Sequence, residues 1–427
     1  MRATIAKPPG VASTVNFPLI HTMFKVIFAL ALTAVAHGQL AVKADLLFTM
    51  TGDLKPIKNG IVLCGEKGKI RAVGPASQVK IPKGYKTLTA KVVTPGIIDA
   101  HSTVGLSGIL NSPKHDQEQL EKSSPIQPEL RAVDAYNGRD PLVKWLRDLG
   151  VTTVHTGHAP GTLMSGQLMV LKTNVPSITS MKDTLIATSA VASTLGAKAL
   201  SKSPGTRSKA IAMLRAELMK AQTRLLKIEE AKNDEEKDAP ASNLKLDVLV
   251  DILNKKTPLL INAQRHQDLA SALRLQEEFG FNLILDGAAE AYLLLDEIKA
   301  AGVPVIVHPT MGRPFGDLEN MTFTLAAQLH KAGILFAFQS GYETYVPKTR
   351  VVHFEAAMAA AYGLPQEVAL AACTIQPAKI LGLEKKIGSL AKGKHADLAL
   401  FDGDPLEMTT HTTGVIIDGK VVSSKVK

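Results

Sequence analysis

The chain contains only two cysteines in 427 residues, Cys64 and Cys373. They lie far apart, and the sequence alone does not tell whether they are connected. Two buried, unreactive thiols are the interpretation that we prefer. So few cysteines exclude a disulfide-built scaffold and a cysteine-based zinc site.

Aromatic residues are also scarce, at 4% of the chain. The formal net charge is +10, from 49 Lys and Arg against 39 Asp and Glu. The basic residues are nevertheless spread along the chain and form no compact cluster interleaved with Phe or Tyr. We therefore expect no nucleic-acid partner. A small-molecule substrate or ligand is the partner that we expect.

The apolar run near the start of the chain is short. It extends from Val26 to Ala36, and its 11 residues cannot span a bilayer at about 1.5 Å per residue. It follows Met23 and Lys25 and ends in small residues, as a secretory signal does. We predict a signal peptide at 1–36, no transmembrane segment after its removal, and export to the periplasm or the extracellular space. A buried N-terminal helix is the alternative, and the sequence leaves open whether Met1 or Met23 begins the protein.

Gly-rich phosphate loops are absent too, which disfavours a dinucleotide-binding fold. Strand-like and helix-like runs alternate over residues 96–385, as in "TPLLINAQ" followed by "DLASALRLQEEFG". This alternation predicts an α/β fold, a (β/α)8 TIM barrel. Residues 37–95 and 386–427 consist of short strands separated by turns, and we expect them to form one small β-sandwich-like domain from both termini.

Residues of about 201–256 differ from the rest of the barrel. They contain a long helix of mixed charge followed by a short acidic stretch that ends in Pro. We interpret them as a solvated helical insertion. A helix that docks a partner is the alternative.

Four stretches of the sequence carry a resemblance to a known family. They are "VVTPGIIDAH", "LGVTTVHTGHAPGTLMSGQLMVLKT", "VALAACTIQPAKILGLEKKIGSLAKGKHADLALFDGDP" and "VIIDGKVV". Together they resemble the amidohydrolase superfamily, in particular its imidazolonepropionase-like and periplasmic amidohydrolase-related branch. The resemblance implies a metal-dependent hydrolase barrel that acts on carbon–nitrogen bonds other than peptide bonds, in cyclic amides or small N-acyl compounds. It also implies one or two divalent metal ions, such as zinc, at the carboxyl-terminal mouth of the barrel.

Most metal-ligand positions that the resemblance implies hold other residues. His101 matches the first histidine of the His-x-His motif, and Thr103 replaces the second. Because a zinc site needs three or four well-placed donors, we expect the usual metal centre to be absent or rebuilt. The remaining positions, carried over from the family, fall on Gln264 after the fifth barrel strand, on Asp286 or Gly287 after the sixth, and on Ser340 or Gln339 after the eighth. Lys172 is a weak stand-in for the ligand of the fourth.

A rebuilt site can be proposed from polar residues that follow strand-like runs. Each of them has an ordinary alternative as a hydrogen-bonded residue of the barrel rim, and Arg313 has one as the ion-pair partner of Asp317. The function is therefore either a hydrolase with a rebuilt site or a catalytically inactive relative that binds a small ligand or a protein partner. The candidates are His101, His155 and His158 as metal ligands, Asp286 and His308 as catalytic groups, and Arg313, Tyr342, Gln264 and Ser340 as substrate-binding groups.

Overall fold

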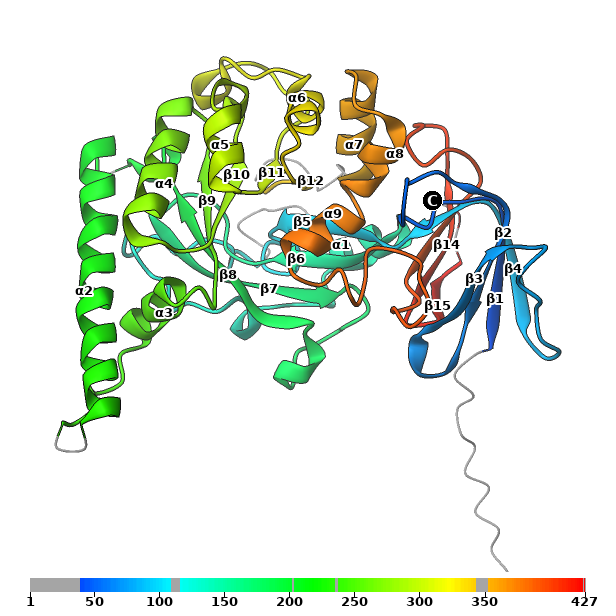
Figure 1. Cartoon of the computed structure of the whole chain (residues 1–427), viewed down its shortest axis with the longest axis horizontal. Helices are drawn as coiled ribbons and strands as arrows, with labels where there is room; N and C mark the ends of the chain where they lie inside the picture. Colours follow the sequence, from blue (N-terminus) through cyan, green and yellow to red (C-terminus); the bar gives the residue numbers. More distant parts are fainter. Residues whose placement is uncertain are drawn as a thin grey trace, which may run out of the picture. The chain divides into compact units, whose positions relative to one another are not determined.

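A computed structural model describes residues 39–108, 116–201, 203–234, 237–342, 352–424 and 426, so the expected signal peptide lies outside the described residues. The described strands form two sheets, one of seven strands and one of eight (Figure 1). No helix in the described ranges is long and apolar enough to cross a membrane.

The seven-stranded sheet is built from both ends of the chain. Its order is β15-β14-β13-β4-β1-β2-β3, and the two halves meet where β13 pairs antiparallel with β4, with Leu398 opposite Pro95. This confirms the predicted small β domain formed from both termini. The strands are β1 (Leu40–Leu47), β2 (Ile57–Cys64), β3 (Ile70–Pro75), β4 (Lys86–Pro95), β13 (Leu398–Phe401), β14 (Thr412–Ile417) and β15 (Lys420–Ser423).

The eight-stranded sheet is the barrel. Its strands follow one another in sequence order, and a parallel bridge between Ser102 and Gly341 joins the first edge to the last. The barrel architecture is therefore as predicted. The strands are β5 (Ile97–Ser102), β6 (Val151–Thr156), β7 (Met164–Lys172), β8 (Ile186–Thr194), β9 (Leu259–Ala263), β10 (Leu283–Gly287), β11 (Val305–Val307) and β12 (Phe336–Phe338).

One barrel strand departs from the expected parallel arrangement. β7 pairs antiparallel with both β6 and β8. The connection from β6 to β7 is only 157–163 and contains no helix, whereas a parallel pair needs a crossover of a dozen or more residues. Lys172, at the end of this reversed strand, therefore lies at the opposite end of the barrel from His101, and its tentative role at the barrel mouth was wrong.

Helices cover the outside of the barrel (Figure 1). Gly280, Gly302 and Gly333 end three of them in the left-handed region, at φ 72°, 64° and 75°, where glycine lacks the steric penalty of a Cβ atom. The α-helices are α1 (Pro141–Asp148), α2 (Arg207–Asn233), α3 (Leu244–Leu253), α4 (His266–Phe279), α5 (Leu295–Ala301), α6 (Leu325–Ala332), α7 (Val352–Ala361), α8 (Gln366–Ala371) and α9 (Ile375–Ile380), and the short 3-10 helices are η1 (Glu66–Gly68), η2 (Ala132–Asp134), η3 (Met181–Asp183), η4 (Ala197–Ala199), η5 (Ala291–Leu293) and η6 (Gly316–Leu318).

The region 201–256 forms the crossover from β8 to β9. It contains α2 and α3, and α2 lies at one edge of the view in Figure 1. One stripe of α2 is buried, at helical spacing, and the rest of the helix is exposed or half-buried. The buried residues are Ala210, Leu214, Leu218 and Ala221.

Both cysteines are free and buried, as predicted. Burial raises the pKa of Cys64 to about 12 and raises the pKa of Cys373 well above its ordinary value. Because the thiolate is the reactive form, these thiols are inert at neutral pH.

A buried ion-pair cluster joins the barrel to the small β domain. The ammonium of Lys172 donates to Asp397 at 2.9 Å, and it also contacts Asp418 and His395. The side chain of Lys172 is only 6% exposed and that of Asp397 5%. A buried pair is held by mutual attraction, and removal of one partner leaves the other charge without compensation.

We expect Lys172→Met to lower the free energy of unfolding by about 3 kcal/mol, because it leaves the Asp397 carboxylate buried and unpaired. Urea denaturation measures this change. Lys83→Met, at an exposed position, is the matched control and should change stability by less than about 0.5 kcal/mol. Equal effects of the two substitutions would contradict this account of the cluster.

A second stability prediction concerns His353 on α7. The ring is buried against Phe354, at 4.3 Å between centroids, and burial lowers the pKa of His353 to about 4. In the unfolded chain the pKa of a histidine is about 6.5. Between these values only the unfolded chain takes up the proton, so the stability of the fold decreases as the pH falls from about 6.5 to about 4.

We expect His353→Gln to remove this dependence, so that its loss of stability from pH 7.5 to pH 5 is smaller than that of the unmodified chain by about 2 kcal/mol. Urea denaturation at both pH values measures the difference. His330→Gln, at an exposed position, is the control. An unchanged pH dependence in His353→Gln would contradict the neutral buried ring.

Candidate functional site

Inside the barrel, an apolar layer of side chains is followed directly by a polar layer. An apolar layer inside the barrel includes Leu260, Ile284, Ile306 and Ala337. Because side chains of a strand alternate between its two faces, the residue two positions later also points inward. These next inward residues are Asn262 after Leu260, Asp286 after Ile284, His308 after Ile306 and Gln339 after Ala337.

Asp286 is the centre of this polar layer. His101 joins from β5, with Nδ1 3.2 Å from Asp286 Oδ1, and both side chains are 0% exposed. Asn262 donates from Nδ2 to Asp286 Oδ2 at 2.7 Å, and the Gln339 amide donates to Asp286 Oδ1. Side chains from four strands thus meet at one carboxylate. We call His101, Asn262, Asp286 and Gln339 the buried cluster.

The buried cluster keeps Asp286 ionised. Burial acts to raise the pKa of this carboxyl, but the charge of His101 and the hydrogen bonds from His101 and Asn262 outweigh burial and lower the pKa below its ordinary value. A group held as a carboxylate accepts hydrogen bonds and stabilises a nearby cation, and it does not serve as a proton donor at neutral pH.

His155 lies beside the buried cluster as a neutral ring. Its Nδ1 donates to the carbonyl oxygen of Ala100 at 2.6 Å, so the proton is on Nδ1 and Nε2 carries a lone pair. Burial, together with the charge of His101, lowers the pKa of His155 to about 3. Its ring centroid is 5.9 Å from that of His101, and its buried Nε2 has no hydrogen-bond partner.

His158 does not join this group. It lies in the loop after β6, and its ring packs so closely against Gly166 that a Cβ atom there would lie 2.4 Å from His158 Cδ2. Burial lowers the pKa of His158 to about 4. Neither of its ring nitrogens is hydrogen-bonded to a side chain of the buried cluster.

The donor set does not fit the metal centre that the resemblance implies. Within the described ranges, no three His, Cys, Asp or Glu side chains are placed to hold one metal ion. Thr103 bonds to Ser107 at 2.9 Å, and Ser340 donates its backbone N–H, at 3.0 Å, and its hydroxyl to Asp99. These two positions therefore satisfy other protein groups.

A cavity of about 1630 Å³ opens above the buried cluster. His308, Tyr342 and Gln264 line it, whereas His101 and Asp286 are fully buried. Tyr342 connects the two levels, because its hydroxyl accepts a hydrogen bond from Asn262 Nδ2 at 2.7 Å. The reacting groups that a ligand in this cavity meets first are therefore His308 and Tyr342.

His308 has a carboxylate beside it. Its Nδ1 is 3.9 Å from Glu355 Oε1, and the two side chains are 4% and 5% exposed. The other oxygen of Glu355 accepts a hydrogen bond from the backbone N–H of Thr310 at 2.8 Å, which fixes the carboxylate. A histidine that faces a cavity with a fixed carboxylate beside it has the arrangement of a general base.

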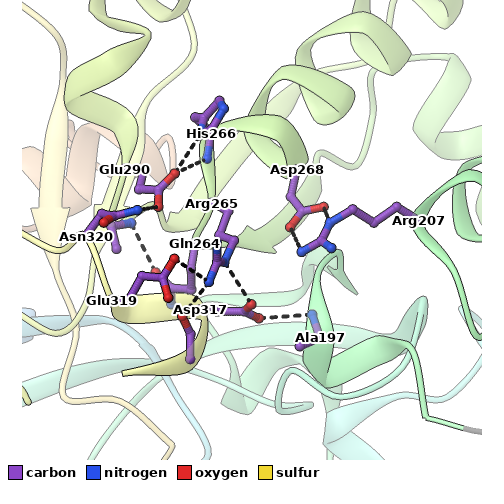
Figure 2. Close-up of polar contacts among 12 residues, drawn as sticks. Ala197, Arg207, Gln264, Arg265, His266, Asp268, Glu290, Asp317, Glu319 and Asn320 are labelled. Carbon is purple, nitrogen blue, oxygen red and sulfur yellow. Dashed lines mark hydrogen bonds and ion pairs between the residues drawn. The ribbon is translucent and has the colours of Figure 1, made fainter. Parts of the chain in front are cut away.

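Arg265 holds the loops around the cavity (Figure 2). It lies 3.4 Å from Asp317 and 3.0 Å from Glu319, and it donates to the carbonyl of Gly316 at 2.8 Å. Asp317 also accepts from the backbone N–H of Ala197 at 2.9 Å. The loops after β8, β9 and β11 are therefore connected through one arginine and one aspartate.

The neighbouring polar groups in Figure 2 have structural partners. His266 donates from its backbone N–H to Glu290 at 2.8 Å, and Asn320 donates to the same carboxylate at 2.8 Å. Arg207 makes a bidentate pair with Asp268 at 2.8 and 3.0 Å. His266 therefore belongs to the rim of the barrel and not to the cavity.

The structure brings together some of the predicted site residues and separates others. His101, His155 and Asp286 lie around the centre of the barrel, and His308, Tyr342, Gln264 and Arg313 line the cavity. Asp317 pairs with Arg265, so the alternative of an Arg313–Asp317 pair was wrong.

Three functional residues were missed in the sequence, namely Asn262, Glu355 and Lys198. Asn262 points inward near the end of β9, and its position two residues after Leu260 was the signal for it. Gln339, which the resemblance gave as the alternative to Ser340, follows the same alternation directly after β12. Glu355 and Lys198 gave no local signal, because each reaches the site from a separate helix or loop.

Comparisons with known proteins agree with this architecture. A family model described as "Amidohydrolase family" matches residues 351–423. Amidohydrolase tasK of Hapsidospora irregularis is 25% identical over 393 residues, which cover 83% of this chain and 39% of that protein. The chain thus spans well under half the length of this relative.

Solved structures extend the likeness to most of the chain. An amidohydrolase from Thermotoga maritima MSB8 has a TM-score of 0.83 and 29% identity, with 91% of this chain and 100% of that chain covered. An adenosine deaminase from Xanthomonas campestris with bound zinc has the same fold, with a TM-score of 0.51, 14% identity, and 90% and 92% of the two chains covered. The matched segment, the relative and the structural likeness support the resemblance seen in the sequence, and the chain is similar to proteins of the amidohydrolase family over most of its length.

Proposed function

We propose that the protein hydrolyses a carbon–nitrogen bond other than a peptide bond, in a cyclic amide or a small N-acyl compound, within the cavity above the buried cluster. The likeness to amidohydrolases supports a hydrolase. The observation that carries the proposal is His308 at the cavity wall, with Nδ1 3.9 Å from the fixed Glu355 carboxylate.

His308 acts as the general base and then as the general acid. It takes a proton from water while the water oxygen bonds to the amide carbonyl carbon. When the carbon–nitrogen bond breaks, His308 returns the proton to the leaving nitrogen, which gives an amine and a carboxylic acid. Glu355 orients the ring and stabilises the imidazolium that forms between these steps. Hydrogen bonds of this kind often tighten only when substrate is bound.

The buried cluster supports the cavity wall and does not react. Asp286 orients the Asn262 amide, and that amide in turn holds the Tyr342 hydroxyl at 2.7 Å. Related proteins are typically metal-dependent, and a zinc ion would supply an activated water in such a site. The donors among the described residues do not fit that arrangement, so no step of the proposed reaction passes through a metal.

One observation favours a second function, an inactive relative that binds a ligand in the same cavity. Asp286 is already bonded to His101, Asn262 and Gln339, and Ser340 is bonded to Asp99. Asp286 and Ser340 therefore have protein partners without substrate, which is typical of residues with a structural role. In that case the cavity binds, and His308 performs no proton transfer.

We also propose that the protein is exported to the periplasm or the extracellular space. The signal-like residues Met23, Lys25 and Val26 to Ala36 support this. Fractionation of expressing cells, followed by N-terminal sequencing, tests it. A cytoplasmic protein that keeps its first residues would overturn the proposal.

We expect His308→Ala to lower kcat/KM by at least about 100-fold for any N-acyl amino acid or cyclic amide that the chain hydrolyses, because general acid–base catalysis contributes about 10²–10⁴-fold. Release of the amine measures the rate. His330→Ala, at an exposed position on α6, is the control and should leave the rate unchanged. Equal rates in the two variants would exclude His308 as the base.

Glu355→Gln should lower kcat and move the acid limb of the pH–rate profile to lower pH. The reason is that an imidazolium without its carboxylate partner loses its proton more readily. A purely structural role for Glu355 would change the rate but not the profile. If the unmodified chain turns over no compound of either class, yet binds one of them, the second function replaces the first.

We expect no stoichiometric zinc in the purified chain after it is stripped with a chelator and reloaded, because the described donors do not converge. Elemental analysis measures the metal content per chain, and His101→Ala is analysed in parallel. Tightly bound zinc that is lost in His101→Ala would show that the site is a metal centre after all.

A further inference from the structure

The cavity wall carries an excess of positive charge. Among the described residues that line it, three are basic, Lys122, Lys198 and Arg313, and one is acidic, Glu121. His308, the proposed base, belongs to the same wall. An excess of cations around a concave site raises the local concentration of anions and favours an acidic ligand.

Lys198 is held over the floor of the cavity. Its ammonium is 4.7 Å from the centroid of the Tyr342 ring, a cation–π contact. The residue belongs to η4, and the backbone N–H of the preceding Ala197 donates to Asp317 at 2.9 Å. The side chain of Lys198 and the backbone next to it are therefore both held in place. They lie beside Tyr342, which connects the cavity to the buried cluster.

Arg313 is at the rim on the loop after β11. The acidic residue nearest in sequence, Asp317, is taken by Arg265 and Ala197, and within the described ranges Arg313 makes no ion pair. The loop itself is fixed through the 3.0 Å contact of Arg265 with Glu319. A guanidinium on a fixed loop binds a carboxylate with two parallel hydrogen bonds.

The rest of the wall is apolar and partly exposed. Met311 is 44% exposed and Phe315 is 76% exposed, and both line the cavity with Leu120 and Leu318. Large apolar side chains that stay exposed around a cavity indicate a surface that an apolar ligand covers.

We propose that the cavity recognises an amide with two different ends, a carboxylate bound by Lys198 and Arg313 and an apolar acyl arm that covers Met311 and Phe315. This proposal names the substrate class of the hydrolase proposed above and in that respect rests on it. The chemical class is an N-acyl amino acid with an aliphatic acyl chain. An uncharged cyclic amide has no carboxylate for the two cations to bind and no acyl arm to cover the apolar wall.

The experiment compares two probes that differ only in charge, N-octanoylglycine and N-octanoylglycinamide. Binding is measured by calorimetry with the full chain carrying His308→Ala, so that no turnover disturbs the signal. We expect the acid to bind at least about tenfold more tightly than the amide, a ratio equivalent to about 1.4 kcal/mol. We expect Lys198→Met and Arg313→Gln each to remove most of that ratio without changing the affinity for the amide.

Lys227→Met, at an exposed position on α2, is the matched control and should keep the full ratio. Thermal unfolding verifies that each variant is folded, and Phe315→Ser tests the apolar arm, for which both affinities should fall together. Equal binding of acid and amide, an unchanged ratio in Lys198→Met and Arg313→Gln, or no binding of either probe at millimolar concentration would overturn the proposal.

The two proposals fail in different ways. If the chain binds the acid more tightly than the amide but hydrolyses neither, the proposed carboxylate subsite is supported and the proposed hydrolase activity is overturned. If the unmodified chain hydrolyses both probes at equal rates, the proposed hydrolase activity is supported and the proposed carboxylate subsite is overturned.

Discussion

The barrel mouth depends on one buried carboxylate. Asp286 has no exposed surface, and an unpaired charge in such a place costs several kcal/mol. His101, Asn262 and Gln339 compensate it, and each comes from a different strand, so the same contacts that neutralise Asp286 also hold β5, β9, β10 and β12 together at their carboxyl ends. Loss of any one partner therefore disturbs both the charge and the geometry of the mouth.

The site has two levels with different physical tasks. The lower level is buried, and its carboxylate Asp286 accepts hydrogen bonds from Asn262 and Gln339, which fix its position. The upper level contains His308, Lys198 and Arg313, which line the cavity. Tyr342 belongs to both levels, since Asn262 holds its hydroxyl and Lys198 lies over its ring. A change in the lower level is thus transmitted to the ligand-facing surface through Tyr342.

Much of the fold was predictable because it depends on local patterns, and much of the site was not. Strand alternation and helix-ending glycines identified the barrel, and the β-like ends identified the terminal sheet. β7 was misjudged because the direction of a strand depends on the length of its connection, here only 157–163. Asn262 was missed because the resemblance pointed to Gln264, two residues further along the chain. The role of Glu355 could not be predicted from the sequence, because Glu355 reaches His308 from a separate helix and such long-range contacts leave no periodic pattern.

The substitutions at the ligand positions follow a common electrostatic logic. A divalent ion tolerates several anionic ligands, whereas a site without it cannot bury two carboxylates side by side. Here the position expected for a ligand after the fifth barrel strand holds Gln264, a neutral amide, and Ser340 stands at a position where an aspartate is expected, with a hydroxyl that donates to Asp99. Asp286 is the carboxylate of the buried cluster, and His101 lies against it at 3.2 Å. An aspartate at position 340 would place a second carboxylate against Asp99, so a serine there fits a site that holds no metal ion.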